Sequence, residues 1–517
     1  MDTLRNVARG TFLLFVGRLA ASGLGVLYLV LLAGKFGASH ATDALFVANS
    51  IPFLFVGAME PSLNLAFIPT FVHRRETGDA EGAWVLAGTL LKGGAFFLLC
   101  FGFVMAVMAP YVVQVLAPGF APDTRALTIG LVRISALLPL LSFVAAFLMA
   151  MNLVACRFLA CAVSTVVGGC GGPVALVLFA NRYGVTALPW AALVSSLAQI
   201  VILASVFNDI RQILRGPLRL THPAVRQMAR VLGPRMAAIS LDQANFLVGT
   251  FFASSLGAGC VSYLGYALRV IGAIRRMVLQ PLGRVLIPVV ARHAALGELA
   301  IIRGLVVNIV TLAGFLLIPA FAFVAGFRNE ILALVLQRGA FGAESTAHTG
   351  LALLCYSLGM ISFVLNPVLD ATFFCLQDSR SPLRVAAPMG VAHAALVYLL
   401  MNLLGYAGIA LAGSVVAGVA SVLLWRLLER KVGALDGASV LSSLGRSLLA
   451  AAGMVAASLG VGMVVAGTAI GHPISRLALC ALVATAAYAL LQFLLNRRVC
   501  RQVLGFLRSD EPVVAEG

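Results

Sequence analysis

The sequence has little charge, and acidic side chains are the scarcer kind. Only 11% of the 517 residues are Asp, Glu, Lys or Arg, and 36 basic residues face 19 acidic ones. The mean hydropathy of +1.03 lies far above that of soluble globular domains. The basic residues are scattered between apolar blocks and form no basic domain, which argues against a nucleic-acid partner. The chain therefore reads as a protein embedded in membrane lipid.

The sequence also lacks the motifs of catalytic and metal-binding proteins. It contains no GxxxxGK[ST] phosphate loop and no HExxH zinc motif. Its nine cysteines show no CxxC spacing, and its seven histidines form no ligand cluster. We expect no enzymatic activity, no metal and no cofactor. Transport by such a chain would need another energy source, and a monovalent cation or the membrane potential are the candidates.

Apolar blocks are what the sequence has in abundance. They are about 20 residues long, enough to cross a roughly 30 Å hydrocarbon core as a helix. We predict an all-α polytopic membrane protein with about fourteen transmembrane helices. These are expected near 11–34, 43–72, 85–110, 126–151, 158–180, 185–208, 231–256, 260–290, 304–327, 346–375, 384–404, 408–428, 446–469 and 474–496.

Alternate connections between these helices carry the positive charge. Examples are HRRE at 73–76, the run at 211–230 and the tail at 497–508, whereas SLGAG at 255–259 is uncharged. The positive-inside rule then places both termini in the cytoplasm.

The chain repeats itself at a nearly constant offset. Four pairs of segments match at offsets of 219 to 221 residues: FGAS at 36–39 with LGAG at 256–259, Ile-Pro at 68–69 with 287–288, VLAPGF at 115–120 with VLQRGAF at 335–341, and SFV at 142–144 with 362–364. Six helices per repeat is an even number, so both copies share one orientation. We expect two six-helix lobes related by a pseudo-two-fold axis along the membrane normal, with a cavity between them.

This repeat defines the predicted domains. They are an N-lobe at 1–208 (helices 1–6), a basic cytoplasmic linker at 209–230, a C-lobe at 231–431 (helices 7–12), two additional helices at 432–496, and a cytoplasmic tail at 497–517.

Charged residues inside the predicted helices are the candidates for function, because each costs roughly 2.5 to 3.5 kcal/mol at a helix centre. The eighth helix is the richest, with four arginines in RVIGAIRRMVLQPLGR at 269–284. At 100° per residue Arg269 and Arg276 lie within about 20° of each other, and Gly272 lies near the same stripe. We predict that this stripe binds an anionic, phosphorylated head group through guanidinium–phosphate hydrogen bonds. The candidate ligands are Arg269, Arg276, Arg284 and, on the first helix, Arg18.

The structural alternative is that Arg275 and Arg284 pair with acidic residues and fix helix packing. Glu60 and Asp242 are candidate arginine partners or coupling sites. Pro61 and Gly272 are candidate hinges. We attribute Asp43, at the end of the second helix, to capping of that helix.

The motifs ATDALFVANSIP (41–52), MEPSLNLAFIPTF (59–71), VLAPGF (115–120), YALR (266–269) and VLIP (285–288) resemble those of the MurJ/MviN family. These are lipid II flippases of the multidrug/oligosaccharidyl-lipid/polysaccharide exporter superfamily. The resemblance implies a flippase of the bacterial inner membrane that moves a polyprenyl-pyrophosphate-linked glycan to the periplasmic leaflet by alternating access. It also implies that 432–496 form a groove for the lipid tail, that Arg269 contacts the pyrophosphate, and that Glu60 matches the family's acidic residue.

The chain departs from the family on two helices. Its first helix reads ASGLGVLYLV where the family carries an Arg-Asp pair, and its second reads FLFVGAM where the family carries arginines. Lipid II is therefore the leading substrate, and an O-antigen or exopolysaccharide unit is the alternative. A cation-coupled drug antiporter and a non-transporting scaffold are weaker alternatives. The expected partners are the glycan lipid and membrane lipids, with peptidoglycan synthases as candidates, and we expect a monomer.

Overall fold

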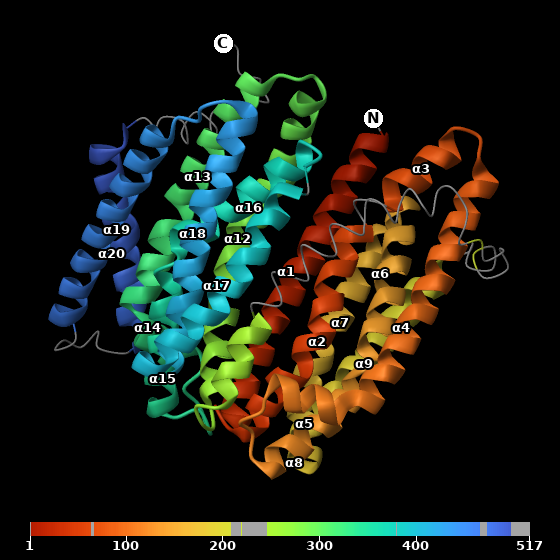
Figure 1. Cartoon of the computed structure of the whole chain (residues 1–517), viewed down its shortest axis with the longest axis horizontal. Coiled ribbons are helices and arrows are strands. Elements are labelled where there is room, and N and C mark those ends of the chain that lie inside the picture. The colour runs from red at the N-terminus through yellow and green to blue at the C-terminus, as the bar shows by residue number, and fades with distance from the viewer. Residues whose placement is uncertain are drawn as a thin grey trace. The chain divides into compact units, whose positions relative to one another are not determined.

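The structure is a computed structural model that describes residues 2–63, 67–207, 213, 219, 246–378, 380–465 and 473–497. For residues 2–8, 53–58, 60–62, 277–286, 288 and 473 it describes the backbone alone. All elements in these ranges are helices (Figure 1). The chain divides into two compact units, one formed by Met1–Ser262 with Arg338–Gly342 and the other by Tyr263–Gln337 with Ala343–Gly517.

The first unit is built on long apolar helices whose cores are rich in aromatic side chains. Helix α1 packs along α7, α7 along α9, and α2 against α5 and α6. Phe67, Phe71 and Phe147 are fully buried in one core cluster. Its elements are α1 Asp2–Phe36, α2 His40–Ser62, α3 Ile68–Glu76, α4 Ala80–Leu116, α5 Pro122–Ser135, α6 Leu138–Val154, α7 Phe158–Leu178, α8 Ala180–Tyr183, the 3-10 helix η2 Gly184–Thr186, and α9 Ala187–Val206.

The second unit holds the remaining labelled helices, apart from the first residues of α12. Helix α18 packs against α15, α16 and α17, and α13 packs against α16 and α19. Its elements are α12 Cys260–Ala295, α13 Leu299–Gly326, α14 Arg328–Val335, α15 Ala343–Ser357, α16 Met360–Cys375, α17 Arg380–Leu404, α18 Tyr406–Val432, α19 Gly437–Val465 and α20 Pro473–Leu495.

The last two helices are joined by polar contacts that lipid could not replace. The Gln492 amide donates to Ser447 Oγ at 2.9 Å and to the Tyr488 hydroxyl at 2.8 Å. Tyr488 in turn donates to the carbonyl of Phe315 on α13 at 2.8 Å. These bonds fix α20 against α19 and α13.

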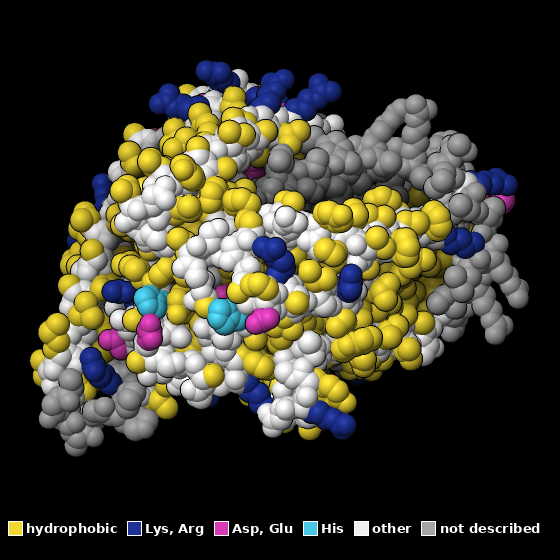
Figure 2. Space-filling model, turned by 60° about the horizontal axis from the view of Figure 1, so that its bottom comes forward, with side chains coloured by type: hydrophobic (Ala, Val, Ile, Leu, Met, Phe, Trp, Pro, Cys, Tyr) yellow, Lys and Arg dark blue, Asp and Glu magenta, His cyan; other side chains and the backbone are white. Residues whose placement is uncertain are grey.

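Most of the helices are long and apolar enough to cross a membrane. Among the described residues ten helices meet this test, and the bent pair α15 and α16 brings the number to 11. The ten do not include α2 or α12, and most of the predicted helix at 231–256 lies outside the described residues. With α2, α12 and the helix at 231–256 as further spans, the total would be fourteen. The count of fourteen transmembrane helices stays a prediction. Hydrophobic side chains cover much of the face in Figure 2, with single Lys and Arg side chains among them.

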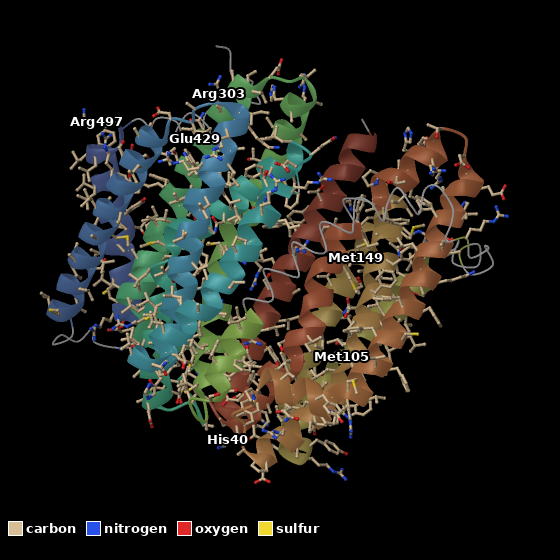
Figure 3. All side chains as sticks on the ribbon, viewed as in Figure 1. His40, Met105, Met149, Arg303, Glu429 and Arg497 are labelled. Carbon is tan, nitrogen blue, oxygen red and sulfur yellow. The ribbon has the colours of Figure 1, made fainter. Side chains whose placement is uncertain are left out.

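Some of the charged side chains lie near helix ends, where a membrane surface can solvate them. Arg303 near the start of α13 and Glu429 near the end of α18 lie at the same end of the second unit (Figure 3). Trp425 Nε1 donates to Glu429 Oε1 at 3.0 Å.

Two predicted helices contain a break. The predicted 126–151 helix is confirmed as one apolar span, Pro122–Val154, in which a turn at residues 136–137 separates α5 from α6. The predicted 346–375 helix is α15 and α16, which meet at 51°, so its prediction as one continuous helix was wrong. The two breaks lie at matching places in the repeat.

Turns repeat in the same way. Gly184 and Gly405 both have φ of 60°, and Cys156 and Gln377, both in the left-handed region that L-residues rarely adopt, have φ of 56° and 57°. The backbone thus bears out the internal repeat. The contact division assigns 246–262 to the first unit, and the predicted domain boundaries stay predictions.

Candidate functional site

Helix α12 carries the predicted cationic stripe, and its start is fixed by a carboxylate far away in the sequence. Asp43 of α2 is 1% exposed. It accepts hydrogen bonds from the backbone N–H of Gly259 at 2.6 Å, from the N–H of Ser262 at 2.7 Å and from Ser262 Oγ at 2.5 Å. The carboxylate therefore satisfies orphan donors at the positive end of α12. Asp43 is a helix cap, but for α12 and not for its own helix.

A ring cluster holds the first turn of α12 within the second unit. Tyr263 stacks on His348 of α15 with ring centroids 5.0 Å apart. His348 Nδ1 lies 2.7 Å from the hydroxyl of Tyr406 at the start of α18. These contacts and the Asp43 cap were not predicted. The matched repeat motifs are FGAS, which lies shortly before Asp43, and LGAG, which ends at Gly259. Their similarity does not predict a contact between the two regions.

Arg269 lies on α12 just after a stretch that is buried on every side. Residues 264–267 are all buried, and the fully buried Tyr266 lies about 60° from Arg269 around the helix. Arg269 is half-buried, and its Nη1 donates to the carbonyl of Gly265 at 3.2 Å.

Arg276 lies two turns further along the same face. A Cβ added at Gly272 would stand 3.2 Å from Arg276 Nη1, so the guanidinium lies back over the glycine. The seven residues between the two arginines correspond to about 10.5 Å along the axis. The structure thus brings together Arg269, Gly272 and Arg276 on one face. Arg275 and Arg276 are both exposed, and Arg275 lies one turn beyond the buried Ile271.

The other predicted residues are not joined to this face by the described structure. Arg18 is exposed on α1 of the first unit, where its carbonyl accepts from Ser22 Oγ at 2.8 Å. The side chains of Arg284, Glu60 and Pro61 lie outside the described residues, as does all of Asp242. Gly272 lies within a continuous helix in this conformation. The roles given to all of these residues stay predictions.

Among the described residues no group of three or more His, Cys, Asp or Glu side chains is placed to hold a metal ion. The chemistry available on α12 is cation–anion recognition. Repeated helical bundles of membrane-spanning length, with two arginines on one face of α12, are typical of a multi-pass membrane transporter.

Known proteins agree with this class. The family model described as lipid II flippase MurJ matches residues 32–479. A probable lipid II flippase MurJ of Rhizobium meliloti is 30% identical over 82% of this chain and 81% of its own length. One of Bdellovibrio bacteriovorus is 25% identical over 98% of both chains. The chain belongs to the lipid II flippase MurJ family, and the resemblance drawn from its motifs is confirmed.

Solved structures confirm the predicted fold class. A lipid II flippase MurJ in an inward closed conformation matches 95% of this chain and 100% of its own, with a TM-score of 0.78 and 17% identity. An inward-facing multidrug resistance MATE family transporter of the MOP superfamily covers 81% of this chain and 95% of its own, with a TM-score of 0.65 and 15% identity. At these identities the likeness concerns the fold alone.

Proposed function

We propose that this chain moves lipid II from the cytoplasmic to the periplasmic leaflet of the bacterial inner membrane by alternating access. The observation that carries the proposal is the family match over residues 32–479. The stripe of Arg269 and Arg276 supplies the chemistry that such a substrate needs. The protein then acts as a transporter and not as an enzyme, with both termini in the cytoplasm.

The proposed mechanism places the pyrophosphate of the lipid on α12. A guanidinium donates two parallel hydrogen bonds to phosphate oxygens. With two arginines about 10.5 Å apart on one face, a pyrophosphate can pass from one to the other as the protein changes state. Gly272 leaves room between them, because any larger side chain would meet the Arg276 guanidinium. Tail binding along α19 and α20 belongs to the same proposal.

The membrane potential is the proposed source of direction. An anionic head group moving outward gains about 2.3 kcal/mol per charge for each 100 mV of inside-negative potential. A coupled monovalent cation is the alternative source. Neither scheme needs a cofactor.

Another lipid-linked oligosaccharide is the second candidate substrate. It is favoured by one observation, the absence of the family's arginines from the segments 21–30 and 53–59. With either substrate, Arg269 and Arg276 must neutralise a larger share of the pyrophosphate charge. In relatives with arginines on three helices, that charge is shared among more cations.

Depletion of the protein in its own host tests the substrate. We expect lipid II to accumulate on the cytoplasmic side and cell walls to fail. Wild-type chain supplied in trans should restore both, whereas Arg269→Ala with Arg276→Ala should restore neither at equal membrane abundance. Arg75→Ala with Arg133→Ala, which removes two exposed arginines of α3 and α5, is the charge-matched control and should complement. Intact walls with loss of a surface polysaccharide would instead identify the second candidate.

A further inference from the structure

A cavity of about 580 Å³ lies between α7 and α9 in the first unit, and no residue of α12 lines it. This volume is in the range of pockets that hold a small organic ligand. The walls are small and apolar, so the cavity suits a hydrocarbon chain. The residues that form them include Cys170, Gly171 and Val174 of α7 and Ala191, Val194 and Ala198 of α9.

The length of the cavity matches one leaflet of a bilayer. Its lining runs from Val167 to Phe179 along α7 and from Ala187 to Ala198 along α9. At a 1.5 Å rise these stretches measure roughly 16 to 18 Å. Half of a hydrocarbon core is about 15 Å. An acyl chain of a diacyl lipid fits this depth, whereas a polyprenyl chain long enough to cross the bilayer would extend beyond it.

One end of the cavity has the chemistry of a membrane interface. Phe179, Tyr183 and Trp190 line it and are 50%, 54% and 58% exposed. Aromatic side chains of this kind mark the level of the head groups. In Figure 1, α8 lies at the opposite end of the first unit from α3. The aromatic end therefore lies at a membrane surface.

Two cations stand at this same end. The Arg182 guanidinium lies over the Tyr183 ring, with Cζ 5.5 Å from the ring centroid. That cation–π contact positions an exposed guanidinium beside the opening. Lys35 Nζ donates to Asn181 Oδ1 at 2.6 Å, which places a second positive charge on the neighbouring residue. A ligand with an apolar chain and an anionic head matches both ends of the cavity.

We propose that this cavity binds an anionic diacyl phospholipid, with one acyl chain between α7 and α9 and its phosphate on Arg182. A guanidinium binds phosphate in a bidentate manner, which a zwitterionic head group with its own ammonium satisfies less well. The site shares no residue with the α12 stripe and does not depend on which glycan the protein carries. In the proposed topology the lipid comes from the periplasmic leaflet.

Native mass spectrometry of the full-length, delipidated protein tests the head group. We expect phosphatidylglycerol to be retained in preference to phosphatidylethanolamine. Arg182→Gln should weaken retention of phosphatidylglycerol about tenfold, the loss expected for one charge-assisted phosphate contact. Arg133→Gln removes an exposed arginine of α5 that donates to Ala106 and not to this cavity, and it should leave retention unchanged.

Photolabelling tests the chain. Phosphatidylglycerol with a diazirine in its acyl chain should label residues 167–198. Val194→Phe should fill the cavity and abolish this labelling. Val201→Phe is the matched control, because both valines are largely exposed, at 62% and 65%, on one face of α9 and only Val194 lines the cavity. Even labelling of all lipid-facing helices with no head-group preference would overturn the proposal. Displacement by a polyprenyl phosphate, but not by phosphatidylglycerol, would also overturn it.

Discussion

At the residue scale, a single carboxylate determines how α12 begins. Asp43 is buried and accepts three hydrogen bonds from Gly259 and Ser262. Replacement by Ala would leave two buried N–H groups without an acceptor, and each such group costs about 1 to 3 kcal/mol. We predict that Asp43→Ala lowers the free energy of unfolding by about 2 to 4 kcal/mol, measured by denaturant titration in detergent.

Two variants make this prediction specific. Asp43→Asn retains one carbonyl acceptor and should lose less than Asp43→Ala. Asp123→Ala removes an exposed carboxylate from the first turn of α5 and should change the free energy of unfolding by less than about 1 kcal/mol. Equal stability of Asp43→Ala and the wild type would show that the cap is dispensable.

The sequence predicted one part of this site and missed another for a physical reason. Arg269 and Arg276 belong to one continuous helix, so the 3.6-residue period alone places them on one face. Asp43 and Ser262 are separated by 219 residues, and no local pattern reports their contact. From the local sequence alone, a carboxylate at a helix end is predicted to cap its own helix. The prediction that Asp43 caps the second helix was therefore wrong.

At the element scale, hydropathy predicted the helices well and their interruptions poorly. The apolar character of the chain continues through residues 136–137 and 358–359, so hydropathy does not mark either break, although Pro139 and Gly359 lie beside them. The chain satisfies its backbone there with short turns, such as Gly359 N–H to the Tyr356 carbonyl at 3.1 Å. Irregular backbone is tolerated in membranes where such bonds satisfy its polar groups.

A second element-scale feature is the ion pair that ties the α16–α17 turn to α18. Asp378 lies 2.5 Å from Lys431 Nζ and accepts from the N–H groups of Arg380 and Ser381. Desolvation by burial raises the pKa of Asp378, but hydrogen bonds from Lys431 and Ser381 outweigh it and lower the pKa from 3.8 to about 2. The carboxylate therefore favours the folded state when ionised.

The lowered pKa fixes the sign of a pH dependence. The stabilisation is fully present above the ordinary pKa of 3.8 and is lost as the pH falls towards 2. We predict that the free energy of unfolding of the wild type falls more steeply below about pH 4 than that of Asp378→Asn. Lys431→Met removes the ion-pair partner of Asp378, so the free energy of unfolding of this variant should fall less steeply with pH than that of the wild type. Parallel curves for wild type and Asp378→Asn would contradict this assignment.

At the scale of the whole molecule, the two units are not simply successive halves of the chain. Residues Arg338–Gly342 belong to the first unit, although Gln337 and Ala343 on either side belong to the second. Within the first unit the Ala340 N–H donates to the Gly34 carbonyl at 2.8 Å. The repeat motif VLQRGAF therefore supplies residues to the fold of the other half, which explains why a division made by sequence repeat and one made by contacts differ.

Gly339 makes this insertion possible, and its replacement tests how much the insertion contributes. Its φ is 54°, and an added Cβ would lie 2.2 Å from the Gly34 carbonyl oxygen. A backbone oxygen cannot move aside as a flexible side chain can, and the left-handed conformation adds its own cost. We predict that Gly339→Ala lowers the free energy of unfolding by more than about 2 kcal/mol. Gly342→Ala, in the same segment, meets nothing within 4 Å and should have little effect. Since the two variants add the same methyl group three residues apart, equal stabilities would mean that Arg338–Gly342 do not hold the first unit together.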